Sequence, residues 1–174
     1  MWARNKHSSK NNGFTIVELL IVIVVIGILA AIVIVAFNGV QDRARWTKLQ
    51  GDLSAVNKAI RMSYAENGSY PTPAAAVGTW RWTYSCSVGT GDAFISGITS
   101  VASNLPQAPC NGGTSNDDTW IYGTDGTDYK LLHIRPNIST GVRNNIPANM
   151  QDPQGRWTST SSTWGYWSPG AANR

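Results

Sequence analysis

Charged residues are scarce in this chain: Asp, Glu, Lys and Arg together make up 14% of its 174 residues, whereas they make up about 25% of an average soluble domain. Cysteine is rarer still, with two residues and no Cys-x-x-Cys pair. The chain also lacks a Gly-rich phosphate loop, a Gly-x-Ser-x-Gly motif, a His-Glu-x-x-His motif and a pair of catalytic acids. These absences argue against the common enzyme and zinc-site classes, so we expect a non-enzymatic protein that needs no cofactor.

Positive charge is concentrated at the N-terminus. Three of the fourteen basic residues, Arg4, Lys6 and Lys10, lie within residues 1–13, which contain no acid. From residue 14 onward, eleven basic residues stand against ten acidic ones, a net charge of +1. A basic leader of this kind normally serves targeting, and the nearly neutral remainder shows no specific nucleic-acid site.

A long apolar segment follows the leader. Of the 24 residues in 14–37, Thr15, Glu18 and Gly27 are the ones outside the apolar set. In a helix this segment is about 36 Å long, enough to cross a bilayer core of about 30 Å. A cleavable secretory signal has an apolar core of about 7–15 residues, so the length favours a single-pass membrane anchor. Positive residues flank both ends, so charge alone does not fix its orientation.

Glu18 is the one acid in the apolar segment, where an ionisable group at mid-bilayer costs about 2.5–3.5 kcal/mol. Two interpretations are open. A carboxylate near a helix N-terminus is favoured by the helix dipole, and its cost falls near the membrane surface. Alternatively, a cut between Gly13 and Phe14 creates an α-amino group one helical turn away, which neutralises Glu18 within one chain or between neighbouring chains.

Three stretches of the sequence carry a family resemblance. Residues 13–20 (GFTIVELL), 26–32 (IGILAAI) and 64–71 (YAENGSYP) together resemble the processing, helix and helix-exit sequences of type IV prepilins and pseudopilins. The similarity covers about residues 10–71 and fades beyond them. A basic leader, a glycine, an aromatic residue and a glutamate at a fixed offset in an apolar run form a specific combination.

The resemblance implies a role for each matching residue. Gly13 precedes the cut, and Phe14 becomes the mature N-terminus and is N-methylated by a prepilin peptidase/methylase. Glu18 pairs with the Phe14 amine of an adjacent subunit. The leader stays cytoplasmic and the head lies outside, with identical or related pilin subunits, membrane lipid, a membrane platform and an assembly ATPase as partners. One departure is Val35, where many pilins have a proline.

After the apolar segment, the apolar residues become periodic. They recur at spacings of three and four residues, as on one face of an amphipathic helix; the positions are Trp46, Leu49, Leu53, Val56, Ile60 and Tyr64. No proline interrupts the pattern, and Asn67-Gly68 is a typical helix stop. We predict one helix over 14–67, with a transmembrane or filament-core half at 14–37 and an amphipathic half at 38–67.

Residues 68–174 predict a small β-rich head. Within it, 72–118 is expected to be a long loop closed by a disulfide between Cys86 and Cys110, the alternative being two free thiols. The strand signals lie at 120–122, 129–134 and 164–167, with a turn at Asp125-Gly126. An antiparallel sheet of these strands, packed on the amphipathic half-helix, gives an α+β, pilin-like fold.

Other candidate sites have plainer alternatives. Asp125 and Asp128 at the hairpin tip, with Asp117 and Asp118 before it, can supply oxygen ligands for calcium, but their spacing fits no EF-hand loop and turn chemistry is the default. The tryptophans of the head can stack on sugars if exposed, and we expect them to fill a core poor in aliphatic side chains. His133 has no carboxylate or nucleophile pattern beside it in the sequence.

Three functions fit these features. We favour a structural subunit of a type IV pilus, inserted in the membrane as a prepilin and then polymerised into an extracellular surface filament through its apolar helix. A pseudopilin of a type II secretion or DNA-uptake machine shares the same N-terminal chemistry. A membrane-anchored binding module or enzyme that never polymerises is the third. An apolar helix that leaves lipid buries itself among copies of itself, and a contact that repeats without closing grows a fibre.

Overall fold

The computed structural model describes residues 13–74, 80–88, 91–108, 110, 118–134, 136–154 and 162–174. Except for Gly13, the predicted leader lies outside these ranges. The chain divides into two units, Met1–Val40 and Gln41–Arg174, and each is described by itself.

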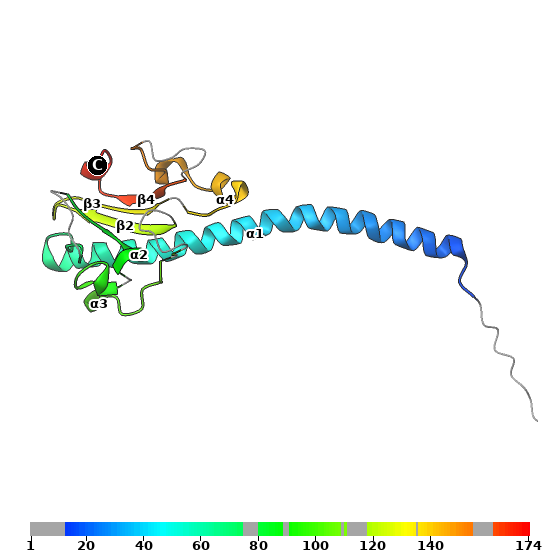
Figure 1. Ribbon diagram of the computed structural model, residues 1–174, viewed down its shortest axis with the longest axis horizontal. Helices are drawn as coiled ribbons and strands as arrows, with labels where there is room; N and C mark the ends of the chain where they lie inside the picture. The colour runs from blue at the N-terminus through cyan, green and yellow to red at the C-terminus, as the bar shows by residue number, and fades with distance from the viewer. Residues whose placement is uncertain are drawn as a thin grey trace, which may run out of the picture. The chain divides into compact units, whose positions relative to one another are not determined.

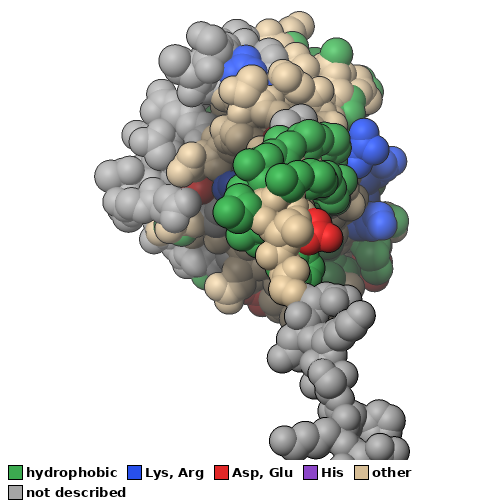
Figure 2. Space-filling view, turned by 90° about the vertical axis from the view of Figure 1, so that its right-hand side faces the viewer, with side chains coloured by type: hydrophobic (Ala, Val, Ile, Leu, Met, Phe, Trp, Pro, Cys, Tyr) green, Lys and Arg blue, Asp and Glu red, His purple; other side chains and the backbone are tan. Residues whose placement is uncertain are grey.

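The first unit contains the beginning of helix α1, which extends over Ile16–Asn67. The helix is continuous through Gly27 and Gly39, the two glycines of its apolar half. Every described side chain up to Val40 is exposed within the chain. Figure 2 shows hydrophobic side chains gathered at the end of the molecule where α1 begins. By length and composition, α1 is apolar enough to cross a membrane, so this part of the helix has to bury its side chains outside its own chain.

The second unit contains a four-stranded antiparallel sheet in the order β1-β2-β3-β4. Its strands are β1 Arg81–Tyr84, β2 Thr119–Thr124, β3 Tyr129–Ile134 and β4 Trp164–Trp167. Short helices and turns connect them: α2 Ser85–Val88, η1 Gly91–Ala93, α3 Ile98–Val101, α4 Thr140–Asn144, η2 Ala148–Met150 and η3 Pro169–Ala171. Figure 1 shows β2, β3 and β4 lying along the later part of α1. The predicted α+β fold with an antiparallel sheet is confirmed.

The β2–β3 hairpin forms where the sequence predicts it. Asp125 Oδ1 accepts hydrogen bonds from the backbone N–H groups of Thr127 and Asp128, at 3.0 and 2.9 Å. Gly126 has a φ of 93°, a left-handed conformation that favours glycine. The aspartate and the glycine therefore close the turn by local chemistry, and the aromatic and β-branched residues on either side extend it into strands.

One face of the sheet packs on the second half of α1. Leu53, Val56 and Ile60 of the predicted stripe are buried, and the ring centroids of Trp46 and Trp164 lie 4.8 Å apart. The other members differ: Leu49 is half-buried, and Tyr64 is 41% exposed. At the end of the helix Ser63 faces inward instead, while Tyr64 stacks on Tyr70, with centroids 4.4 Å apart. The stripe prediction was therefore wrong for Tyr64, because the neighbouring position takes the buried face.

The opposite face of the sheet carries a second, smaller apolar cluster. Ile121, Leu132 and Ile134 are buried there, with Trp82, Tyr84 and Trp167 packed against them. Lys130 lies on the same face and is fully buried with Asp152, its Nζ atom 2.7 Å from Asp152 Oδ1. An ion pair removed from water in this way needs good geometry and further hydrogen bonds to offset its desolvation cost.

The segment 72–118, predicted as a long loop, contains more regular structure than expected. Strand β1 and the short helices α2 and α3 lie within it. The Cys86–Cys110 disulfide is present, with a Cα–Cα distance of 5.5 Å. Cys86 is also held through its backbone N–H, which donates to Thr119 Oγ1 at 3.1 Å. The disulfide therefore fastens this segment beside the start of β2.

Removing this disulfide should lower the stability of the second unit. The bridge closes a loop with a sequence separation of 24, for which chain entropy predicts about 3–4 kcal/mol. We expect the Cys86→Ser/Cys110→Ser variant to lose about that much free energy of unfolding, measured by urea titration of full-length protein in detergent micelles. In a second arm, the wild-type protein is titrated with urea under reducing conditions, which break the same disulfide. An unchanged urea midpoint in both arms would show that the bridge does not constrain the unfolded chain.

Candidate assembly site at the start of helix α1

Thr15 and Glu18 form a reciprocal cap at the N-terminus of α1. Thr15 donates from its backbone N–H and from its hydroxyl to Glu18 Oε2, both at 2.8 Å. The Glu18 backbone N–H donates to Thr15 Oγ1 at 3.2 Å. This is the arrangement of a capping box, in which two otherwise unsatisfied donors of the first turn gain acceptors.

The cap places the carboxylate at the end of the helix, close in sequence to the predicted cleavage point. Both bonds from Thr15 end on Oε2, and Oε1 accepts no hydrogen bond within the described ranges. Phe14, the predicted mature N-terminus, is 82% exposed. The site therefore combines an anchored carboxylate, one acceptor oxygen without a described partner and the exposed residue Phe14.

Gly13 is not required by packing in this structure. A Cβ at this position would meet no atom within 4 Å, and its φ lies outside the left-handed range. The role of Gly13 before a cleavage point stays a prediction.

Sequence reasoning offered two interpretations of Glu18, and the capping box supports the one based on the helix N-terminus. The pairing of Glu18 with a Phe14 amine stays a prediction, as do cleavage after Gly13 and methylation of Phe14. The spacing Thr-x-x-Glu was the signal for the cap, and the sequence-based interpretation of Glu18 did not use it.

The two calcium candidates serve the hairpin and its neighbour. Hydrogen bonds from the N–H groups of Asp128 and Thr127 lower the pKa of Asp125. Asp128 Oδ1 accepts from the Ser168 hydroxyl at 2.6 Å. Among the described residues there is no group of three or more His, Cys, Asp or Glu side chains arranged to hold a metal. Asp117 lies outside the described ranges, so the calcium hypothesis stays untested.

His133 has a partner that the sequence did not reveal. Its Nε2 atom lies 2.9 Å from Asp118 Oδ1, and the side chain is 1% exposed. Burial lowers the pKa of His133 more than the neighbouring Asp118 raises it. Nδ1 is buried without a hydrogen-bond partner in the described part of the chain. The sequence has no carboxylate pattern beside His133, and the β2–β3 register supplies the partner by bringing the residue before β2 next to β3.

His133 should make the second unit sensitive to acid. The unfolded chain has the ordinary histidine pKa of 6.5, and the folded chain has a lower one, so the unfolded state binds the proton first as pH falls. We expect the free energy of unfolding to be at its full value above about pH 6.5 and to decrease below it. Urea titrations of full-length protein between about pH 7.5 and 5.5 measure this, with His133→Gln as the control that loses the dependence. Equal pH profiles for the two proteins would exclude His133 as the source.

Two tryptophans of the head fill its core, as expected. Trp120 and Trp164 are 2% and 0% exposed. Trp82 and Trp167 are partly buried on the opposite face of the sheet, and Trp157 lies outside the described ranges. In the head, these two rings pack in the core together with buried aliphatic side chains such as Leu131 and Val142.

The capped start of an apolar helix, with basic residues before it in the sequence, is the arrangement that the comparisons with known proteins address. A family model described as the prokaryotic N-terminal methylation motif matches residues 8–34. The chain is similar to type II secretion system core protein G of Pseudomonas aeruginosa, with 36% identity over 36% of this chain and 44% of the relative. It is similar to the Klebsiella michiganensis protein of the same name, with 40% identity over 34% of this chain and 42% of the relative. It is also similar to type IV major pilin protein PilA of Myxococcus xanthus, with 30% identity over 65% of this chain and 52% of the relative.

The resemblance to type IV pilins and pseudopilins is therefore confirmed. The part matched by the methylation motif, residues 8–34, lies in the N-terminal segment. The chain spans about half the length of the curated relatives it matches. No solved structure significantly matches the chain.

Proposed function

We propose that this protein is a structural subunit of a type IV pilus. It is inserted in the membrane as a prepilin with its leader in the cytoplasm and its head outside, and a prepilin peptidase/methylase cuts it after Gly13 and methylates Phe14. The subunit then polymerises through its apolar helix, with Glu18 pairing with the Phe14 amine of a neighbour. Its role is structural and not catalytic, and the assembled filament lies on the cell surface.

The observation that carries this proposal is a helix exposed on all sides in the first unit and bearing one anchored carboxylate at its start. Moving such a helix from lipid into a bundle of identical helices gains little hydrophobic free energy, because lipid tails are as apolar as the side chains. Packing and polar contacts then decide whether the helix stays in lipid or joins the bundle. A carboxylate paired with an amine in the bundle has a favourable interaction that it lacks when it is alone in lipid.

A pseudopilin is the second candidate. Sequence identity favours the pseudopilin, whereas the length of the similarity favours the pilus subunit. Identity is higher to the secretion proteins, at 36% and 40%, but those similarities cover about a third of this chain. The similarity to the major pilin covers 65% of it and therefore extends into the head. Because the longer similarity includes part of the head, we favour the pilus.

Shearing separates these two candidates. Cells that express the full-length chain are sheared, the sheared fraction is pelleted by ultracentrifugation, and the chain is quantified in the pellet and in the membranes. A pilus subunit should be abundant in the sheared pellet. A pseudopilin should stay with the cells, and a non-polymerising anchor should stay in the membrane fraction as single copies. A cytoplasmic protein measured in the same pellet controls for lysis.

A further inference from the structure

Almost all acidic side chains of the described residues have a partner within the chain. Each of these accepts a hydrogen bond from another described residue or forms an ion pair with one: Glu18, Asp42, Asp52, Asp92, Asp118, Asp125, Asp128 and Asp152. Glu66 is exposed and has no such partner anywhere in the described ranges. It is the one described carboxylate that is left for another molecule.

Glu66 also occupies an unfavourable position in helix α1. It lies in the last turn, next to the final residue Asn67, and no basic residue shares that turn. A negative charge at a helix C-terminus is opposed by the helix dipole, by about 0.3–1 kcal/mol at an exposed site. A cation supplied from outside the chain would remove this penalty.

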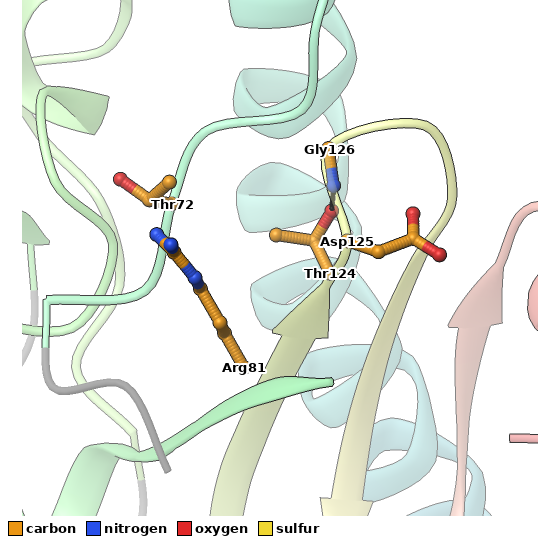
Figure 3. A pocket seen from close by; sticks show the side chains of 5 residues that line it. All are labelled: Thr72, Arg81, Thr124, Asp125 and Gly126. Atoms are coloured by element: carbon orange, nitrogen blue, oxygen red, sulfur yellow. Dashed lines mark hydrogen bonds between the residues drawn. The ribbon is translucent and has the colours of Figure 1, made fainter. Parts of the chain in front are cut away.

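Arg81, which has no partner among the described residues, lines a cavity near the same end of α1. The cavity has a volume of ≈ 330 Å³ and is lined by Thr72, Arg81, Thr124, Asp125 and Gly126. Figure 3 shows the Arg81 side chain directed toward Thr72, with the Asp125 carboxylate turned away from it. Arg81 forms no hydrogen bond or ion pair with any described residue. The Tyr70 N–H donates to the Gly126 carbonyl at 2.9 Å, which joins this cavity to the chain leaving α1.

We propose that the Arg81 cavity is a carboxylate-binding site whose occupant is Glu66 of a second copy of this chain. The inference rests on the proposed function in one respect, that copies of the chain assemble. A guanidinium presents paired donors that match both oxygens of a carboxylate. Arg81 is itself exposed, as the free bases of α1 are, so what distinguishes it is its place in the lining of a cavity that a carboxylate can enter.

Each copy carries both halves of this contact. A carboxylate on one copy and a cavity on the next form a heterologous contact, which leaves one free half at each end and can be repeated along a fibre. A single pair of this kind contributes little affinity, and its main effect is on the register in which neighbours join. The Glu66–Arg81 contact would therefore set how the heads are arranged, while the apolar helices supply the buried surface.

A charge exchange in the full-length chain tests this contact. We expect Arg81→Glu and Glu66→Arg each to reduce the pelleted, assembled fraction at least about threefold, because reversal replaces attraction by repulsion. The double variant Arg81→Glu/Glu66→Arg should return to near the wild-type amount. Lys58→Glu, which reverses another exposed base on α1, is the matched control and should assemble like the wild type.

Two results would overturn the proposal. One is a double variant that assembles no better than the poorer single variant. The other is a loss with Arg81→Glu and none with Glu66→Arg, which would mean that the cavity binds a different carboxylate.

A cysteine pair separates this inference from the proposed function. Cells that express Glu66→Cys and Arg81→Cys chains together should form a dimer with a short bismaleimide crosslinker, which spans the Cα separation of an Arg–Glu pair that a direct disulfide does not, and neither variant should form it alone. If the wild-type chain does not pellet after shearing, the proposed pilus fails, and the cysteine pair still reports whether copies meet at this cavity in the membrane. If the wild-type chain pellets and the dimer is absent, the Glu66–Arg81 contact alone is wrong.

Discussion

Replacing Lys130 by methionine should lower the free energy of unfolding of the second unit by about 3–5 kcal/mol. Lys130 and Asp152 are both 0% exposed, and their charged atoms lie 2.7 Å apart. Without the ammonium group, the buried Asp152 carboxylate loses this ion pair while its desolvation cost remains, and that loss accounts for most of the expected effect.

The ammonium group has further acceptors that the methionine would leave unsatisfied. Lys130 Nζ donates to the backbone oxygens of Ala172 and Arg174, at 3.1 and 2.9 Å. It also lies 5.5 Å from the centroid of the Trp167 ring. The substitution should therefore loosen residues 172–174 as well as weaken the core, and hydrogen exchange at these residues should become faster.

The double variant Lys130→Met/Asp152→Leu distinguishes a lost ion pair from a lost side-chain volume. Replacing both charges by apolar groups of similar size removes the desolvation cost together with the attraction, so stability should recover by at least half. Lys58→Met, an exposed position on α1, should change the urea midpoint very little. A double variant as unstable as Lys130→Met would contradict the assignment of the loss to the Asp152 carboxylate left without its lysine.

Glu18→Gln should abolish assembly while leaving the start of α1 intact. A glutamine at the third helical position still completes a capping box with Thr15, so the helix N-terminus keeps its acceptors. The amide cannot pair with an amine as a carboxylate does, and a charge-assisted hydrogen bond is worth about 1.5–3 kcal/mol. That corresponds to a loss of roughly tenfold to a hundredfold in the association constant for each added subunit, which should remove pelleted filaments.

Thr15→Val provides the opposite test. It removes the hydroxyl that bonds Glu18 Oε2 and keeps the carboxylate, so we expect it to assemble far better than Glu18→Gln. Membrane insertion of both variants, measured by their resistance to carbonate extraction, should equal that of the wild type. If Glu18→Gln assembles normally and Thr15→Val does not, the carboxylate acts only as a helix cap and the proposed ion pair is wrong.

The parts of this fold that local chemistry controls were predictable. The β2–β3 hairpin follows from an aspartate and a glycine between two aromatic-rich runs, and α1 follows from apolar periodicity with a glycine stop. Strand β1 was missed because its four residues lie in a segment rich in Gly, Ser and Pro, and it becomes a strand by pairing with β2 across a long sequence separation. Local propensity does not report a partner of that kind.

The candidate sites also divide into contacts between residues close in the sequence, which could be predicted, and contacts between distant residues, which could not. The role of Glu18 could be approached from sequence, because its partner Thr15 is three residues away. The burial of Lys130 beside Asp152 could not, because the two are brought together by the path of the chain between β3 and β4. A lysine in a strand pattern is ordinarily expected at the surface, and the sequence holds no local sign of the carboxylate that meets it.

The proposed function depends most on the creation of a new amine beside Glu18 before the helices join. Intact-mass and N-terminal analysis of the chain recovered from sheared material, and from membranes of the same cells, measures this directly. We predict a mature chain that begins at Phe14 and carries one added methyl group, with the leader-bearing form confined to membranes. Recovery of assembled material that still carries residues 1–13 would contradict it.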